Sequence, residues 1–455
     1  MLEPIIRIPA ATIPYHYKSP LGPHGHSLPG GAQRDPLRFA LAMTQQYGDI
    51  ARVRFLSWPG YLVNHPHGVK HVLEENHRNY TKDIYTLKFF RPFLGNGLLT
   101  NDGESWLHQR RLVQPALHRQ HMAALGTLVT GATGAMLEHW RGFAGSAEPL
   151  DISVEMMRLA LRITGLALFN IDLSNEADAV GQAFATVRAL LSDYLYTPFT
   201  SLNRRVQTTV RKLDTLIYDI IDKHRRQGTD AGDLLSLLLS ARDQETGLGM
   251  NDRQVRDEVV TLLLAGHETT ATMLAWTWYL LSQHPEVEHH LHIELDEVLG
   301  GQLPTVERLV DLPYTQMVIK EALRLYPPVF CLGRKARSDD EISGHAIPAG
   351  SMILLCPYTT HRHPDFWEQP EVFDPQRFTP ERSAGRTHYA YFPFGGGPRL
   401  CIGQRLAMME AQLILATIAQ RYRLQLVPGH PVEPELSLTL RPRHGLPMTI
   451  SRSSI

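Results

Sequence analysis

A single cysteine, Cys401, stands between a glycine-rich turn and a long apolar helix. Residues 394–403 read FGGGPRLCIG, and residues 404–422 repeat apolar side chains with helical spacing. Glycines reach backbone angles closed to other residues, so the turn can aim amide N–H groups at the sulfur while a flat ring lies close. The positive end of the helix is expected to lower the thiol pKa. Cys401 is therefore predicted to be an anionic metal ligand; the alternative is a buried free cysteine after an ordinary turn.

This segment resembles the haem-ligand loop of cytochromes P450. The family pattern is Phe, two free positions, Gly, one free, Arg, one free, Cys, one free, Gly, and Phe394, Gly397, Arg399, Cys401 and Gly403 fill its fixed positions. The resemblance implies a haem b cofactor (iron protoporphyrin IX) whose iron is bound by Cys401. It also implies that Phe394, Gly397 and Gly403 contact the cofactor and that Arg399 pairs with one of its carboxylates.

Composition argues against several other kinds of protein. The formal net charge of the 455 residues is -1 at pH 7, so no global charge points to nucleic acid or to a charged membrane surface. Three cysteines occur, Cys331, Cys356 and Cys401, and none belongs to a Cys-x-x-Cys motif. This argues against a disulfide scaffold and a tetrahedral zinc site, and it favours a cytoplasmic location.

No membrane anchor is expected. Residues 1–31 contain six prolines and no long apolar run, which argues against a signal peptide. Residues 259–281 are long and apolar enough to suggest a membrane span, but His267 and Glu268 lie at the middle, where a charge costs about 3 kcal/mol. A buried helix with a kink is the better interpretation.

Helical periodicity dominates the chain before residue 325, and short strands and coil follow. The predicted fold class is mainly α with small β-sheets (α+β); the resemblance implies the P450 fold, with haem buried between the long central helix and the cysteine loop. We expect a proline-rich segment (1–30) that packs on a single haem domain (31–455), without a fused reductase. The predicted helices span residues 106–117, 126–140, 152–169, 181–195, 204–227, 234–239, 252–283, 285–299, 314–325 and 404–422. Strands are predicted at 49–55 and 61–64, which form a hairpin, at 351–355, and in a second hairpin within 438–451.

The longest predicted helix contains the sequence AGHETT at residues 265–270. Gly266 removes a side chain where a ligand could approach, and a threonine hydroxyl can bond to a carbonyl one turn earlier and open the helix locally. This resembles the acid–alcohol pair of the P450 central helix, which maps onto Glu268 and Thr269. Such a pair can deliver protons to bound dioxygen. A helix kink with incidental polar groups is the alternative.

A charged pair on one helix, Glu321 and Arg324, is spaced i and i+3. Taken alone, such a pair is a commonplace surface interaction. Together with Arg377 downstream it resembles the buried Glu–Arg–Arg lock of P450s, although Gln376 stands where the family often has an acid. We expect these three residues to be structural.

Cations are needed to bind the haem carboxylates. Trp106 and Arg110 are spaced i and i+4, and they resemble the family's propionate contact; Arg334 and Arg399 fit further contacts. Arg111 is expected on a solvated face. The histidine-rich sequence at 361–363 lacks a metal-binding frame and is also predicted to be solvated.

An apolar, partly aromatic pocket is predicted from positions relative to these motifs, although each of its residues could equally be ordinary core. The proposed lining residues are Leu87, Phe89, Leu98, Leu190, Tyr194, Leu262, Ala265, Gly266, Val329, Phe330 and Leu438.

The resemblance implies a soluble monooxygenase that inserts one atom of O2 into a C–H or C=C bond of a hydrophobic molecule such as a fatty acid, terpenoid, steroid or polyketide. Electrons would come from an external ferredoxin-like or flavodoxin-like donor with its reductase. A docking patch containing Arg110 or Arg111, Arg399 and Arg405 would attract that donor. Two alternatives remain open: a P450-fold enzyme that uses peroxide or isomerises its substrate, and a haem-binding carrier or sensor without catalysis.

Overall fold

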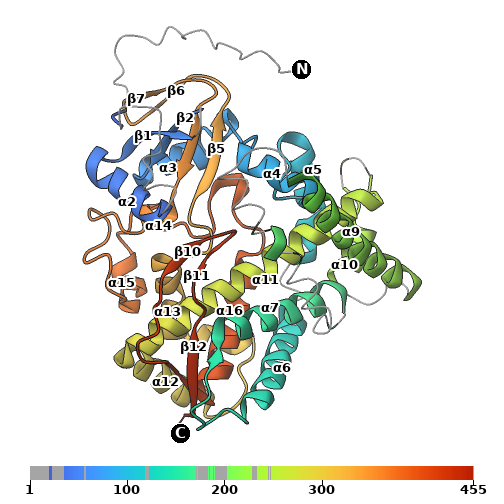
Figure 1. Ribbon diagram of the computed structural model, residues 1–455, viewed down its shortest axis with the longest axis vertical. Coiled ribbons are helices and arrows are strands. Elements are labelled where there is room, and N and C mark those ends of the chain that lie inside the picture. Colours follow the sequence, from blue (N-terminus) through green and yellow to red (C-terminus); the bar gives the residue numbers. More distant parts are fainter. Residues whose placement is uncertain are drawn as a thin grey trace.

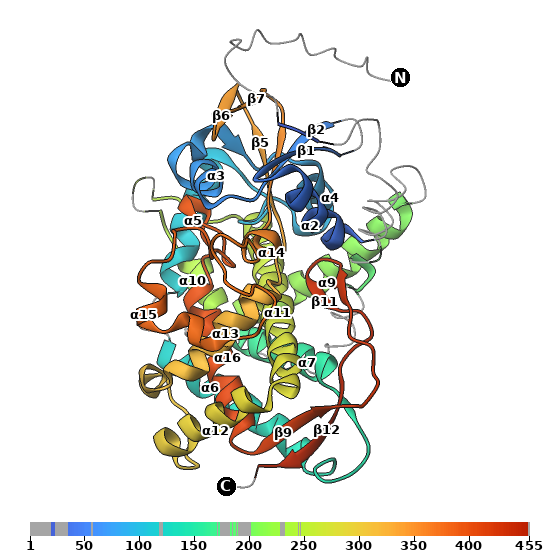
Figure 2. The same ribbon diagram turned by 90° about the vertical axis from the view of Figure 1, so that its left-hand side faces the viewer.

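The computed structural model describes residues 20–22, 35–55, 58–117, 122–170, 172, 183, 185–187, 189, 202–227, 233–243, 245 and 247–453. Most of the helix predicted at 181–195 lies outside this part of the chain. Strands β1, β2, β5, β6 and β7 lie at one end of the molecule, and β9 and β12 lie at the other end beside α6, α7 and α12; the central helix α11 (Asp252–Gln283) runs through the middle (Figures 1 and 2).

The predicted helices lie close to helices of the structure, but two long helices, Pro36–Tyr47 and Tyr85–Leu94, were not predicted. Helix α11 has the predicted bounds because Asn251 caps it, its side chain accepting from Gln254 N while the Gln254 side chain accepts from Asn251 N. The helix runs without a break through Gly266, so the expected opening is absent. The other long helices are α2 (Pro36–Tyr47), α4 (Tyr85–Leu94), α5 (Gly103–Val113), α6 (Met122–Trp140), α7 (Ile152–Phe169), α9 (Leu202–Gln227), α12 (Pro285–Leu299), α13 (Pro313–Leu325) and α16 (Gln404–Ala419). Shorter ones are α3 (Pro66–Lys70), α10 (Leu234–Ser240), α14 (Pro357–Thr360) and α15 (Pro380–Ser383).

The strands at the first end belong mostly to a sheet in the order β1-β2-β8-β5-β3. Its strands are β1 (Ile50–Phe55), β2 (Trp58–Val63), β3 (Tyr80–Thr81), β5 (Leu332–Ala336) and β8 (Met352–Leu355). Strands β1 and β2 form the predicted hairpin, although β2 begins earlier than expected. Strands β2 and β8 pair in parallel, and β8 pairs antiparallel with β5. The remaining short hairpin joins β6 (Asp340–Ile342) to β7 (His345–Ile347).

The C-terminal hairpin predicted within residues 438–451 is wrong. Strand β11 (Leu440–Pro442) pairs with β10 (Pro434–Leu436), whereas β12 (Pro447–Arg452) pairs with β9 (Tyr422–Leu426) and β4 (Leu150–Asp151). The alternating pattern identified strands correctly but not their partners. Because β9 starts at Tyr422, α16 also ends earlier than the periodicity suggested.

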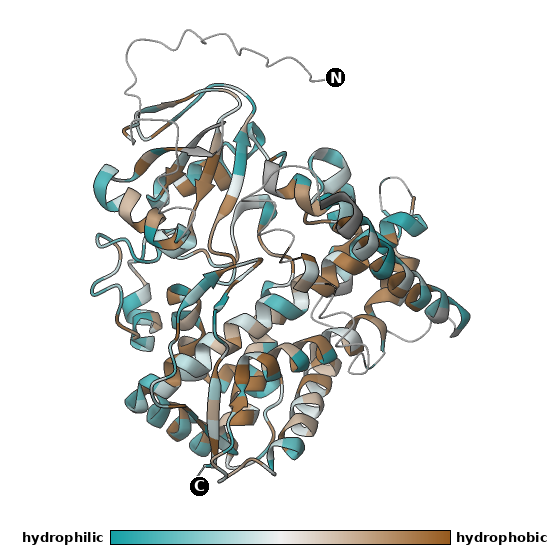
Figure 3. Ribbon diagram, viewed as in Figure 1, coloured by the Kyte–Doolittle hydropathy of each residue, from teal (hydrophilic) through white to brown (hydrophobic). Residues whose placement is uncertain are grey.

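The main hydrophobic core lies where α11 packs against α7, α13 and α16. Trp276 of α11 stacks on Tyr326, with ring centroids 3.9 Å apart, and its indole nitrogen donates to Leu440 O over 2.6 Å. Hydrophobic residues run through the interior of this helical half, while the outer helices α9 and α12 carry hydrophilic stretches (Figure 3). Within the described chain, no helix combines the length and apolar character that a membrane span requires.

Candidate functional site

The loop before α16 holds Cys401 through tight backbone contacts. Cys401 N donates to Phe394 O over 3.0 Å, which closes the turn. Gly395 and Gly397 have φ angles of 73° and 59°, in the left-handed region that favours glycine. A Cβ on Gly397 would also lie 1.8 Å from Leu73 O. The glycines of this segment are therefore required by the backbone path.

A hydrogen-bond chain fixes this loop to the N-terminal part of the molecule. Gly397 N donates to the Tyr389 hydroxyl over 3.0 Å, and that hydroxyl donates to Glu74 Oε2 over 2.9 Å. Glu74 belongs to a π-helical turn, His71–Glu75. The position of the cysteine loop thus depends on a segment far away in sequence.

The electrostatic setting of Cys401 differs from the prediction. Desolvation by the surrounding protein raises the pKa of the thiol above its ordinary value, although the backbone N–H groups of Gly403 and Gln404 and the charge of Arg110 act in the opposite direction. The helix N-terminus helps the thiolate but does not outweigh desolvation. A bound metal ion reverses this balance because a coordinating thiol is deprotonated outright.

Three cations gather beside the loop. Asp102 is the counter-charge that acts on Lys82, Arg334 and Arg399. Burial lowers the pKa of Arg334 and of Arg399 to about 10, and burial together with both arginines lowers that of Lys82 well below its ordinary value. Gathering buried positive charge is unfavourable unless an anion compensates it. The two arginines were predicted from their positions relative to the motifs, whereas no sequence motif marks Lys82.

Arg110 and Arg399 both lie near the ring of Trp106. The guanidinium carbons are 5.6 Å and 3.7 Å from the ring centroid, respectively. Arg399 also donates to Asp102 and to Asn101 O, and Arg110 donates to Leu400 O over 3.0 Å. These contacts draw α5 and the cysteine loop together.

Helix α11 is open along one face. Between Val255 and Ser282 all its residues are buried except Tyr279 and four others, Leu262, Ala265, Gly266 and Thr269. These four have the spacing i, i+3, i+4, i+7 and so share one side of the helix. Ala265 is exposed although it lies midway along the helix that crosses the molecule. This face of α11 is therefore accessible, whereas the rest of the helix between Val255 and Ser282 is covered by protein, apart from Tyr279.

The two residues of the predicted acid–alcohol pair, Glu268 and Thr269, lie in different surroundings. The Thr269 hydroxyl donates to Ala265 O over 2.7 Å on the open face. Glu268 is 1% exposed, and its Oε1 accepts from the Thr439 hydroxyl over 3.1 Å. Thr439 also contacts the Thr272 hydroxyl at 3.2 Å. The carboxylate thus belongs to a buried hydroxyl network that the sequence did not reveal.

The charged pair of α13 is fully buried. Glu321 and Arg324 have side chains that are 0% exposed and share two hydrogen bonds, 2.7 and 2.8 Å long. Arg377 Nε lies 3.3 Å from Glu321 Oε1. Arg324 also donates to His361 O, Pro370 O and Val372 O. The three predicted residues come together, and Arg324 holds the segment that leads towards the cysteine loop.

The prediction that residues 361–363 are solvated is wrong. His361, Arg362 and His363 are 0%, 7% and 8% exposed. His361 Nε2 accepts from Phe392 N over 2.9 Å, just before the cysteine loop. Burial and the nearby Arg324 keep the pKa of His361 well below its ordinary value, so the ring is neutral and can accept this hydrogen bond. Arg111 is half-exposed and pairs with Asp243 and Glu245.

The predicted pocket residues do not all lie in one place. Leu87, Leu262 and Leu438 all pack against one hydrophobic cluster that contains Phe89, whereas Phe330 packs against a different one. Leu98 is tied to α11 because its N–H donates to Glu258 Oε2 over 3.0 Å. Burial raises the pKa of Glu258 to about 7. Val329 is exposed, and Leu190 and Tyr194 lie outside the described residues.

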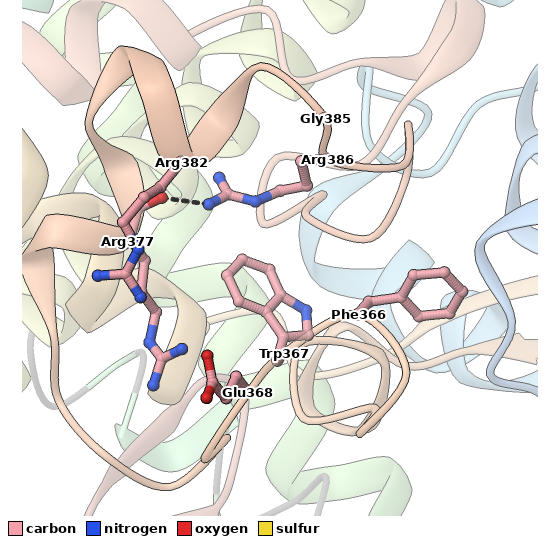
Figure 4. Close-up of a pocket in the computed structure, with 7 residues that line it drawn as sticks. All are labelled: Phe366, Trp367, Glu368, Arg377, Arg382, Gly385 and Arg386. Atoms are coloured by element: carbon pink, nitrogen blue, oxygen red, sulfur yellow. Dashed lines mark hydrogen bonds between the residues drawn. The ribbon is translucent and has the colours of Figure 1, made fainter.

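A separate cleft of about 220 Å³ is lined by arginines near α15 (Figure 4). Its arginines have partners: Arg377 approaches Glu321, Arg382 binds Asp374 over 2.7 Å, and Arg386 donates to Arg377 O. Arg386 also lies over the ring of Trp367, while Phe366 points away from the arginines. This cleft belongs to the structural network around Glu321 and not to the surroundings of Cys401.

Comparison with known proteins agrees with this geometry. A family model described as Cytochrome P450 matches residues 21–449. The chain belongs to the cytochrome P450 family. It is 39% identical to the cyclooctatin synthase of Streptomyces melanosporofaciens over 446 residues, which cover 95% of this chain and 96% of that protein. The cyclooctat-9-en-7-ol 5-monooxygenase of the same organism is 40% identical over 89% of this chain and 88% of its own length.

A further relative of this P450 is named as an oxygenase. The pentalenene oxygenase of Streptomyces avermitilis is 34% identical over 90% of this chain and 92% of its own length. The crystal structure of the cytochrome P450DA heme domain superposes with a TM-score of 0.88 at 27% identity and covers 96% of this chain and 98% of that chain. The chain therefore has the P450 fold and is a P450 monooxygenase.

Haem, which the family binds, fits the residues present in this P450. Cys401 is accessible at the start of α16, and a Cβ on Gly403 would meet no protein atom within 4 Å. The cluster of Lys82, Arg334 and Arg399 provides the positive charge that two carboxylates need. The open face of α11 provides an apolar surface for a ring.

Proposed function

We propose that this P450 hydroxylates a terpenoid. Three relatives are named for cyclooctatin, cyclooctat-9-en-7-ol and pentalenene, and the substrates of this group are terpenoids. The observation that carries the proposal is the open face of α11, where Leu262 and Ala265 offer apolar contacts beside the Thr269 hydroxyl, while Gly266 packs closely against Thr164 of α7. A hydrophobic substrate gains free energy on leaving water for such a wall.

The cofactor in this proposal is haem b, whose iron Cys401 would bind through its sulfur. When bound, haem supplies the reductive activation of dioxygen. Arg110, Arg334 and Arg399 hold its carboxylates, and Lys82 contributes further positive charge. Trp106 covers the guanidinium of Arg399 and keeps water away from it. Phe394 and Gly403 would contact the ring, whereas Gly397 packs against Leu73 O and would act by shaping the loop.

Protons are managed by Thr269 and Glu268. Thr269 directs its hydroxyl hydrogen to Ala265 O, so the oxygen lone pairs remain available to accept a hydrogen bond on the open face. Glu268 holds its carboxylate in the network with Thr439 and Thr272, one residue behind Thr269. In this arrangement Thr269 contacts the reacting groups and Glu268 acts as the proton reservoir.

In this proposal the electrons come from an external ferredoxin-like or flavodoxin-like protein with its reductase. The protein is proposed to be cytoplasmic, where such donors are found. Arg405 is exposed at the start of α16 and suits the docking patch, whereas Arg399 is mostly buried and pairs with Asp102. Charge neutralisation in Arg111→Gln and Arg405→Gln should slow reduction by an acidic donor and flatten its salt dependence. Unchanged reduction rates and an unchanged salt dependence in both variants would show that Arg111 and Arg405 do not form a docking patch for the donor.

The first test is the carbon monoxide difference spectrum of the reduced, haem-loaded protein. The parent should show the strongly red-shifted Soret band of a thiolate ligand, and Cys401→Ser should lose it completely. Cys331→Ser is the matched control because it removes another cysteine, and it should keep the band. A parent without the band would favour a haem carrier or sensor.

The second test is a ligand-induced spin-state titration with cyclic terpenes, fatty acids and steroids. Terpenoids should give saturable shifts at the lowest concentrations, followed by hydroxylated product that depends on a surrogate electron donor. Tighter binding of fatty acids or steroids would overturn the substrate class. Turnover with peroxide alone and none with the donor would favour the peroxide-using alternative.

A further inference from the structure

Two cysteines that take no part in haem binding lie opposite each other at the end of the main sheet. Cys331 immediately precedes β5, and Cys356 immediately follows β8. The antiparallel register of these strands pairs Leu332 with Leu355. The next pair in the same register is Cys331 with Cys356, and side chains of opposed residues emerge on the same face of a sheet.

The register also fixes the type of pair that the cysteines form. Ala336 N donates to Ser351 O over 2.9 Å, which marks that pair as hydrogen-bonded. Hydrogen-bonded and non-hydrogen-bonded pairs alternate along an antiparallel ladder, so Cys331 and Cys356 form a non-hydrogen-bonded pair. Cα atoms in such pairs are about 4.5 Å apart. This spacing is within the range of roughly 4.4–6.8 Å that disulfides span.

The two sulfurs are already in contact. The Cys331 thiol donates a hydrogen bond to Cys356 Sγ, and the Cys356 thiol donates to Phe330 O over 3.0 Å. The hydrogen bond to Cys356, together with burial, raises the pKa of Cys331. Burial opposes ionisation of Cys356, but hydrogen bonds from Cys331, Thr359 and Tyr358 lower its pKa. The lowered pKa of Cys356 favours its thiolate, which is the nucleophilic form of cysteine.

We propose that Cys331 and Cys356 form a reversible cross-strand disulfide, with hydrogen peroxide as the oxidant. The Cys356 thiolate attacks one peroxide oxygen and becomes a sulfenic acid as the O–O bond breaks and water leaves. The Cys331 sulfur then attacks the Cys356 sulfur, the S–S bond forms, and the sulfenic oxygen leaves as a second water. The two thiols together lose two protons and two electrons, and one peroxide is reduced to two waters.

Oxidation changes a contact of the polypeptide next to the proposed pocket. The disulfide removes the Cys356 thiol hydrogen, so Phe330 O loses this donor and keeps a long hydrogen bond from Tyr358 N, 3.4 Å. Phe330 is a proposed pocket residue, and Arg334 lies three positions beyond Cys331. The bond also ties the ends of β5 and β8 covalently. It therefore constrains the backbone that carries both residues.

The test uses the haem-loaded full chain and a small molar excess of hydrogen peroxide, followed by denaturation in a thiol-alkylating reagent and peptide mass spectrometry. The parent should yield a linked peptide containing Cys331 and Cys356, lighter by two hydrogen atoms than the two thiol peptides together, and dithiothreitol should abolish it. The melting temperature should rise on oxidation and return on reduction.

Variants distinguish this pair from adventitious oxidation. Cys331→Ser should give no linked peptide and should leave oxygen adducts on Cys356, with no reversible rise in melting temperature. Cys401→Ala should still form the link, because the haem ligand takes no part. If Cys331→Ser fails to fold, Cys356→Ala replaces it. Separate oxygen adducts on the parent cysteines without a link, a link through Cys401, or no reaction at either sulfur would each overturn the proposal.

Discussion

The guanidinium of Arg399 lies on the face of Trp106, with its central carbon 3.7 Å from the ring centroid. Arg399 belongs to the cysteine loop and Trp106 to α5, so this contact joins two segments that the sequence keeps far apart. Asp102 N-caps α5 and binds the same guanidinium. Burial raises the pKa of Asp102, but hydrogen bonds from Thr81, Lys82 N and Gly103 N and the charge of Arg399 lower it to about 2 overall. The carboxylate therefore stays ionised and partly balances the cation cluster.

Lys82→Ala should release haem faster, because the variant removes one positive charge from the cluster that we propose binds the haem carboxylates. The loss of one charge-assisted contact, about 1.5–3 kcal/mol, corresponds to a release rate roughly 10-fold or more higher. Transfer of haem to excess apomyoglobin measures this rate. Lys70→Ala is the matched control because Lys70 pairs with the exposed Glu75, and an equal increase there would contradict the assignment.

Arg324→Ala should destabilise the protein by about 3–5 kcal/mol, because Glu321 would remain as a buried charge without its main partner. Chemical denaturation of the haem-loaded protein measures the free energy of unfolding. Arg141→Ala breaks another i, i+3 pair, with Glu138, in which both side chains are at least half exposed. That control should cost less than about 1 kcal/mol, and similar losses in the two variants would refute the buried lock.

Thr269→Ala should uncouple the reaction, because the hydroxyl that faces the open side of α11 disappears. We expect the product formed per dioxygen consumed to fall by roughly a factor of ten or more, with a matching rise in peroxide release. Thr269→Ser keeps a hydroxyl and should retain most of the coupling. Unchanged coupling in Thr269→Ala would remove the assigned role.

Glu410 of α16 gives a prediction about pH. Burial raises its pKa to about 8, and its Oε1 has no hydrogen-bond partner. Between the ordinary glutamate pKa and 8 the unfolded chain has lost this proton while the folded chain keeps it, so this group makes folding less favourable as pH rises. The slope is about 1.4 kcal/mol per pH unit and levels off above the folded pKa.

Glu410→Gln should remove that slope and gain stability relative to the parent as pH increases. Denaturation series across this pH range measure the difference in free energy of unfolding. Glu297→Gln on the exposed side of α12 is the control, with an expected change within about 0.5 kcal/mol. A parent and Glu410→Gln with parallel pH profiles would show that Glu410 titrates normally.

The helices and the cysteine loop could be predicted because their signals are local. Helix α11 carries its own cap at Asn251, and α12 starts at Pro285 and is followed by Gly300, so the predicted bounds were right. Strand pairing depends on residues distant in sequence. The alternation in 438–451 therefore indicated strands but could not show that β11 and β12 have different partners.

Lys82 and His361 show why parts of the site were missed. Lys82 lies in a loop without periodicity, and its importance comes from Arg334 and Arg399, which only folding brings near. His361 belongs to a polar run that looks solvated, yet Arg324 O and Phe392 N provide partners that make its burial possible. Glu268 was predicted from its motif, but its contact with Thr439 could not be.

The close approach of Gly397 to Leu73 has a consequence for chimeric enzymes. A cysteine loop taken from another P450 would have to fit the turn at His71–Glu75, because this turn packs directly against the loop. Glu74 reaches that loop through Tyr389, which belongs to a third segment. Exchanging residues 394–403 alone would separate the loop from the turn that packs against it. A chimeric enzyme should therefore take all three segments from the same parent.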